Sequence, residues 1–244
     1  AIPFAPGKPA SAMRFVDLLT HMSGLTYGLQ NRNNIDAAYR ENNFDFARDH
    51  LDSDAFIEKL SKLPLEFAPG TGWNYSVSTD VLGVAVERIS GMRLGDYFEK
   101  HIFAPLGMTD THFGVAEEQS ERLVDAYAYQ PGHAPKMINA GATSKLNEPG
   151  AFDSGGGGLI GTIADYHRFS TMLLNGGDLD GARIVSPKTI RLMRTNHLPN
   201  NADLTEMSSS LFSEANNAGT GFGLGFAMVI DPSKTLMPSS EGEF

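Results

Sequence analysis

The sequence predicts an α+β fold that is mostly helical. Several segments place apolar residues at the three-to-four spacing of amphipathic helices. Only residues 221–230 alternate over a useful length, and two shorter strand-like pieces lie around 112–113 and 126–129. Because a lone strand cannot satisfy its own backbone groups, we expect it to pair with those pieces or with a sheet outside the chain.

The first half of the chain predicts four helices. They are expected over 14–21, over a segment that Ser53 caps and Pro64 closes, over the segment ended by Gly91, and over 94–102 before Pro105. The apolar side of the third is made by Leu82, Ala85, Val86 and Ile89. Residues 28–50 are rich in Asn, Arg and Asp, and we expect a surface excursion there.

Local capping patterns predict two helices in the second half. Thr162 is expected as an N-cap with Asp165 as its reciprocal partner, and this helix should stop at 175–177. Ser186 followed by Pro187 is typical of the first residues of another helix.

Composition excludes several classes of function. The net charge of −10 and the absence of a basic cluster argue against a nucleic-acid partner. With no cysteine, the chain has no disulfide, no thiolate metal site and no cysteine nucleophile. No apolar run approaches the roughly 18 residues of a membrane span. The sequence does not distinguish cytoplasm from periplasm.

Two chemical motifs fail their context tests. Residues 156–161 fit G-x-G-x-x-G, but 147–153 do not resemble the buried strand that a dinucleotide site requires. Close backbone packing is the simpler explanation of these glycines. The seven histidines are dispersed without metal-ligand spacing, so no metal is expected. No G-x-S-x-G elbow is present, although a spatial Ser-His-Asp triad is not excluded by spacing.

Tyr75 stands just ahead of a helix start in the stretch GWNYSVSTDVLG. A tyrosine at such a place can anchor the loop through a buried ring, or it can carry a proton in catalysis. The local sequence by itself favours the anchoring role.

Five ordered motifs change this interpretation, because together they resemble the serine β-lactamase-related family. This family comprises class C β-lactamases, DD-peptidases, family VIII carboxylesterases and related acyltransferases. The motifs are LLTHMSGL at 18–25, PGTGWNYS at 69–76, PLGM followed by Thr111 at 105–111, GGGGL at 155–159 and GLGF at 223–226.

The resemblance implies acyl transfer through a covalent acyl-serine, without metal or cofactor. It assigns Tyr75 as the proton shuttle of the family's Tyr-x-Asn element and Tyr27 as a tyrosine lining the substrate cleft. Val77 replaces the family's asparagine and cannot hydrogen-bond a substrate amide. With the surrounding residues, this favours the carboxylesterase branch over true β-lactamases. The expected substrate is therefore a small ester, with a β-lactam-like compound as the alternative.

The chain contains no Ser-x-x-Lys, the family's nucleophile motif. We therefore expect an internal fragment: a linker over 1–13, a mostly helical domain with small β pieces over 14–215, and a strand segment of the α/β domain over 216–244. The missing segments would be its partner, and the chain alone is expected to be inactive. The alternatives are a β-lactamase, a DD-peptidase, or a degenerate member that binds ligands without chemistry.

Overall fold

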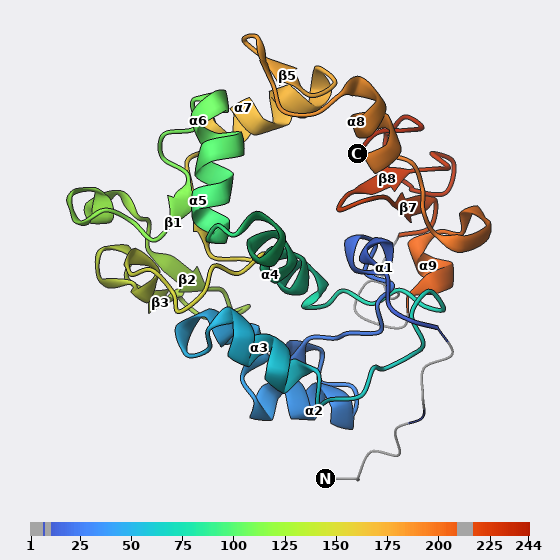
Figure 1. The fold of residues 1–244 in the computed structure, drawn as a ribbon, viewed down its shortest axis with the longest axis horizontal. Helices are drawn as coiled ribbons and strands as arrows, with labels where there is room; N and C mark the ends of the chain where they lie inside the picture. The colour runs from blue at the N-terminus through green and yellow to red at the C-terminus, as the bar shows by residue number, and fades with distance from the viewer. Residues whose placement is uncertain (1–6, 8–10, 209–216) are drawn as a thin grey trace.

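Helices dominate the structure, a computed structural model that describes residue 7 and residues 11–208 and 217–244. The expected linker over 1–13 falls mostly outside the described residues. The α-helices are α1 Phe15–Leu19, α2 Asn34–Glu41, α3 Ser53–Leu60, α4 Ser78–Ser90, α5 Leu94–Phe98, α6 Ala104–Leu106, α7 Ile163–Leu174, α8 Pro187–Met193 and α9 Leu204–Met207. Figure 1 shows them arranged as a ring, with α4 crossing between the two sides of the molecule. None of the helices within the described ranges has the length and apolarity to cross a membrane.

The described strands form two-stranded antiparallel ribbons. The pairs are β1 His112–Phe113 with β4 Leu159–Ile160, β2 Ala126–Ala128 with β3 Lys136–Asn139, β5 Asp178–Leu179 with β6 Ala182–Arg183, and β7 Thr220–Phe222 with β8 Ala227–Val229. The α+β class and the short pieces at 112–113 and 126–128 are confirmed.

The single long strand expected over 221–230 is wrong. The segment reverses direction and pairs with itself, with Thr220 opposite Val229 and Phe222 opposite Ala227. Gly225 has φ +90° in the turn, a backbone conformation that glycine adopts without steric cost. Alternation of apolar residues alone cannot distinguish one long strand from a tight hairpin. Here β7 finds its partner, β8, within the same segment.

The main hydrophobic core lies between α2, α3 and α4. It contains Tyr39, Phe44, Phe56, Val84 and Phe152, each at most 3% exposed. The surface excursion expected over 28–50 is therefore wrong, since this segment supplies two of those side chains. Its polar residues cap and flank α2: the Asn33 side chain accepts from the N–H groups of Ile35 and Asp36.

Some capping predictions are confirmed and others are corrected. Thr162 and Ser186 cap α7 and α8 through side-chain bonds, and Gly91 ends α4 in the left-handed conformation. The cap of α3 is Asp52 rather than Ser53. The helix begun by α5 continues through a π-helical turn, Glu99–Phe103, and past Pro105, because proline is tolerated in the first turn of α6. It ends at Gly107.

The carboxylate of Asp165 does not reach back to Thr162 as expected. It accepts instead from the backbone N–H of Asp110, at 2.8 Å, and from the hydroxyl of Thr111, at 2.9 Å. This side chain therefore connects α7 to the turn before β1.

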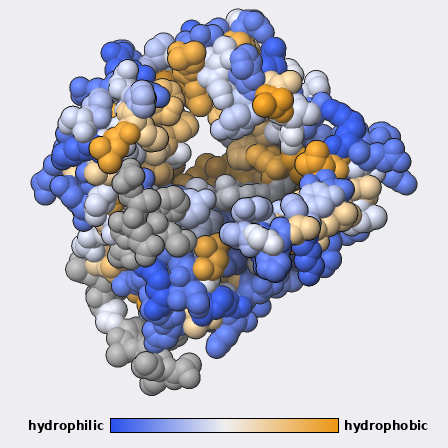
Figure 2. All heavy atoms as spheres, turned by 180° about the vertical axis from the view of Figure 1, so that it is seen from behind, coloured by the Kyte–Doolittle hydropathy of each residue, from blue (hydrophilic) through white to orange (hydrophobic). Residues whose placement is uncertain are grey.

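Helix α4 buries positions outside its expected apolar stripe, and Leu82 of the stripe is only partly buried against the core. The buried positions are Ser78, Asp80, Gly83 and Val84, whereas Ile89 on the apolar stripe is 77% exposed. In the space-filling view of Figure 2 the ring remains open at its centre, with hydrophobic residues at the margin of the opening.

Candidate active site

The segment before α4 is held by two buried side chains that directly precede Tyr75. Trp73 is 2% exposed and Asn74 is fully buried. The Asn74 side-chain amide donates to the carbonyl oxygen of Leu25 at 3.0 Å and to the carboxylate of Glu66 at 2.8 Å. These contacts fix the backbone on the N-terminal side of Tyr75.

The phenol of Tyr75 lies at the surface, with 40% of the residue exposed. Its ring centroid is 4.9 Å from that of His21 and 5.3 Å from that of Tyr27. The side-chain amide of Gln30 donates to the Tyr75 carbonyl oxygen at 2.5 Å. The ring is therefore packed against His21 and Tyr27 while the residue remains partly exposed to solvent.

His21 is the buried neighbour of Tyr75. It is 4% exposed, and its ring also meets those of Trp73 and Phe222. Its Nδ1 lies 3.3 Å from the hydroxyl of Ser76. Burial lowers the pKa of His21 to about 4, so the imidazole is neutral at pH 7.

A chain of buried hydroxyls continues from His21. The hydroxyls of Ser76 and Ser78 lie 2.7 Å apart, as do those of Ser78 and Ser23. The backbone N–H of Leu25 donates to the Ser23 hydroxyl at 3.1 Å. This chain joins the LLTHMSGL segment to the first turn of α4 behind Tyr75.

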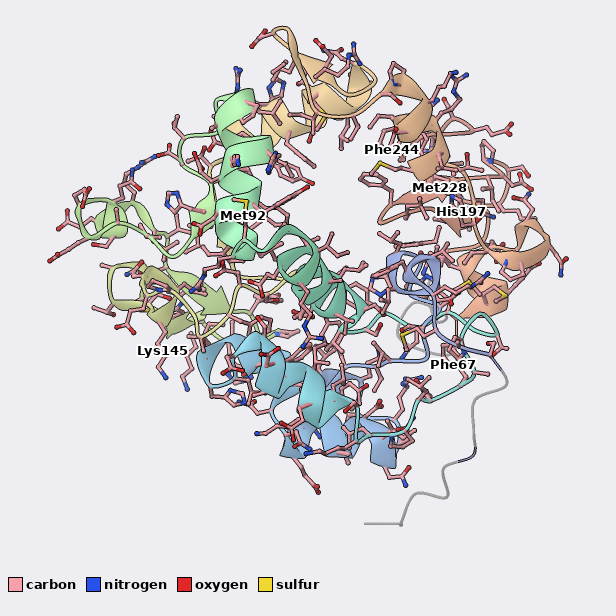
Figure 3. The ribbon with its side chains drawn as sticks, in the orientation of Figure 1. Phe67, Met92, Lys145, His197, Met228 and Phe244 are labelled. Carbon is pink, nitrogen blue, oxygen red and sulfur yellow. The ribbon has the colours of Figure 1, made fainter. Side chains whose placement is uncertain are left out.

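A pocket of about 410 Å³ is lined by Tyr27, the tyrosine whose ring contacts Tyr75. Its lining combines aromatic, acidic and backbone surfaces, supplied by Tyr27, Phe44, Asp80, Phe152 and the glycines 156–158 among others. Lys145 also lines it and lies between the β2–β3 ribbon and α3 in Figure 3. Burial, the nearby carboxylate of Asp80 and the Tyr75 phenol raise the pKa of Tyr27, so its hydroxyl stays protonated near neutral pH.

Two of the three site residues expected from the sequence lie together. Tyr27 and Tyr75 share a ring contact, whereas Val77 is fully buried in the main core. A contact between Val77 and substrate stays a prediction, and it would require that core to open.

Two further residues of this site were not singled out from the sequence. His21 lies within the LLTHMSGL motif, but the motif alone gave it no role. Its ring contact joins it to Tyr75, more than fifty residues further along the chain. Asp80 gave no signal, because its partners lie near position 155 and only folding brings them to α4.

The glycine run fails the dinucleotide context in the structure as well. Residues 156–158 precede the short strand β4, and 147–155 contain no strand. A nucleotide-binding strand would instead lead into the glycines.

Comparison with known proteins identifies relatives over nearly the whole chain. Residues 1–235 match the sequence model of the Beta-lactamase family. An uncharacterised protein of Mycobacterium tuberculosis is 36% identical over 224 residues, which cover 92% of this chain and 53% of that protein. Esterase EstB of Burkholderia gladioli is 32% identical over 244 aligned residues, covering 92% of this chain and 56% of EstB.

Solved structures share the fold. EstCE1, described as a hydrolase with promiscuous acyltransferase activity, superimposes with a TM-score of 0.73 at 24% identity, covering 96% of this chain and 62% of that one. The chain spans about half the length of the curated relatives it matches.

Proposed function

The chain belongs to the Beta-lactamase family, and we propose that it supplies the proton-shuttling tyrosine and part of the substrate pocket of a serine hydrolase acting on small esters. The name of EstB, a relative at 32% identity, favours ester substrates within this family. Val77, which cannot hydrogen-bond a substrate amide, favours the same choice.

The placement of Tyr75 is the observation that carries this proposal. Its phenol is 40% exposed, while His21 and Tyr27 support the ring and Gln30 holds its backbone. A phenolate at this place takes the proton of a serine hydroxyl as that oxygen attacks the ester carbonyl carbon. The bond from that carbon to the alcohol oxygen then breaks, and the phenol returns the proton to the departing alcohol. Water later hydrolyses the acyl-serine.

The 244-residue chain contains no Ser-x-x-Lys motif. The chain therefore does not supply the attacking serine of this reaction through that motif. We expect the chain alone to show no burst of p-nitrophenol from p-nitrophenyl acetate or butyrate. Burst kinetics with the isolated chain would contradict this part of the proposal.

A chimera tests the positive claim. In it, this chain replaces the matched segment of EstB, which provides the remaining 44% of its own sequence. We expect p-nitrophenyl ester hydrolysis by the folded chimera and slower turnover of the β-lactam nitrocefin. Faster turnover of nitrocefin than of the esters would reassign the substrate class, and a folded chimera inactive on both would favour a ligand-binding protein without chemistry.

Substituting the proposed shuttle gives the sharpest measurement. Tyr75→Phe in the chimera should lower the rate of acylation by about 10²-fold or more, the usual contribution of general acid–base catalysis. Tyr129→Phe is the control, because Tyr129 is 75% exposed and lies outside the pocket lining. A change within twofold for Tyr75→Phe would leave Tyr75 a structural role only.

A further inference from the structure

Gly155 and Gly156 lie directly against the first two turns of α4, with no room for a side chain at either position. A Cβ atom on Gly155 would collide with the carbonyl oxygen of Thr79. On Gly156 it would lie 2.7 Å from a carboxylate oxygen of Asp80 and 3.0 Å from the hydroxyl of Tyr27. These glycines therefore allow a close approach to α4, and they bring a backbone turn into contact with Asp80.

Asp80 is the polar centre of this contact. It is 7% exposed, and its Oδ1 accepts from the hydroxyl of Ser154 and, at 3.4 Å, from the backbone N–H of Gly156. The same N–H also donates to the Ser154 hydroxyl at 3.1 Å. The hydroxyl of Tyr27 lies beside the same carboxylate, since both groups flank the position of a Cβ on Gly156.

These contacts join three segments that are distant in the sequence. Tyr27 follows α1, Asp80 belongs to the first turn of α4, and Ser154 precedes the glycine run. The Tyr27 ring contacts that of Tyr75, and Tyr27 also lines the pocket together with Asp80 and Ser154. The position of Tyr27 therefore affects both the ring contact with Tyr75 and the wall of the pocket.

We propose that Asp80 is a positioning residue of this site, whose buried carboxylate holds the turn at 154–156 beside Tyr27 and so fixes the wall of the pocket that Tyr27 shares with that turn. The role of the wall in substrate binding rests on the proposed function, but the hydrogen bonds of Asp80 to Ser154 and Gly156 do not. An uncompensated buried carboxylate is costly, so these donors and Asp80 depend on one another.

Among the described residues, few charged side chains lie near the Asp80 carboxylate. Asp45, Asp49 and Lys145 line the same pocket, and Asp45 accepts from the backbone N–H of Gly28 at 2.9 Å. Asp45 is therefore a matched control: a second pocket carboxylate bonded to a glycine N–H, but with no bond to the turn at 154–156. Burial raises the pKa of Asp80 against the lowering effect of its donors.

Amide proton shifts in the ¹⁵N-labelled 244-residue chain test the proposal by nuclear magnetic resonance. An N–H that donates to a carboxylate changes its shift when that carboxylate takes a proton. Between pH 7 and pH 3.5 we expect the Gly156 amide to titrate with a midpoint above the ordinary aspartate value. Asp80→Asn should abolish this titration while keeping the fold, because the amide oxygen still accepts from Ser154 and Gly156. It should also shift the Tyr27 ring resonances.

The control variant Asp45→Asn should leave the titration of Gly156 unchanged. Gly156 titrating normally in Asp80→Asn, or not at all in the unsubstituted chain, would overturn the proposal, and the second result does not depend on any variant folding. Tyr27 resonances that do not move in Asp80→Asn would also overturn it. An inactive chimera with these titrations intact would instead refute the proposed function and leave the role of Asp80 standing.

Discussion

The imidazole of His21 is buried against the ring of Tyr75, the proposed proton shuttle. The His21 backbone has φ +57°, a left-handed conformation that directs the ring inward beneath Tyr75. The buried ring is kept neutral by its surroundings, and its Nδ1 is close to a serine hydroxyl rather than a carboxylate. The support for Tyr75 is thus uncharged at the pH where the phenol would act.

The burial of His21 predicts a loss of stability in acid. Its pKa falls from 6.5 to about 4 on folding, so between these values the unfolded chain binds the proton and the folded chain does not. The free energy of unfolding should therefore fall as pH is lowered from 6.5 to 4, by about 3 kcal/mol from this group. Urea unfolding at several pH values measures the loss.

His21→Asn removes the titrating ring, and asparagine tolerates the left-handed backbone. We expect a smaller loss of stability over this pH interval in this variant. His133→Asn changes an exposed histidine and should follow the unsubstituted chain. Equal pH dependence in all three proteins would show that His21 takes its proton without cost in the folded state.

At the scale of elements, Asp153 connects α5 to the segment that ends in the glycine run. Its carboxylate is 2% exposed and accepts from Arg93 through two nitrogens, at 2.7 and 2.8 Å, and from the backbone N–H of Gly95 at 2.9 Å. Three donors satisfy this buried charge, and they lie about sixty residues away in the sequence.

Asp153→Ala leaves the Gly95 N–H and the Arg93 guanidinium without their acceptor. We expect it to lower the free energy of unfolding by about 1–3 kcal/mol, the cost of leaving buried hydrogen-bonding groups without a partner, because the Arg93 side chain is itself 43% exposed. Asp54→Ala breaks the exposed pair of Asp54 with Arg88 and should change stability little. Urea unfolding of both variants checks this, and similar small effects would mean that Asp153 is readily replaced by water.

Elements were predictable where their determinants are local. Thr162, Ser186 and Gly91 act within a few residues of themselves, and each caps a helix as the sequence indicates. Helix α2 was not predicted, because its polar composition resembles a loop and its stability comes from burying Tyr39 beside Phe44. Its existence depends on packing rather than on helix propensity.

At the scale of the whole molecule, the ring presents apolar helix faces to solvent. On α7, Ile163, Tyr166 and Leu174 share one face and are 89%, 70% and 81% exposed, opposite the buried Met172. Exposed apolar side chains gathered on one helix face promote association. The isolated chain should therefore associate at high concentration in sedimentation velocity.

Replacing both Ile163 and Leu174 with Glu should reduce that association and leave the unfolding midpoint nearly unchanged. Both side chains are more than four-fifths exposed, so they contribute little to the core. The matched control is Lys188→Glu, which adds negative charge at an exposed position of α8. Equal association of the double variant and the unsubstituted chain would exclude this face as the cause.

The sequence by itself determined the α+β class, several helix ends, the family, and Tyr75 as the residue to examine. Each of these depends on spacing or motifs that can be recognised along a contiguous stretch. Only the tertiary structure decided which side of α4 is buried, that 220–229 pairs with itself, and that Asp80 and His21 meet the two site tyrosines. The reason is physical: a buried polar group is stable only beside its partners, and here those partners come from segments fifty or more residues apart.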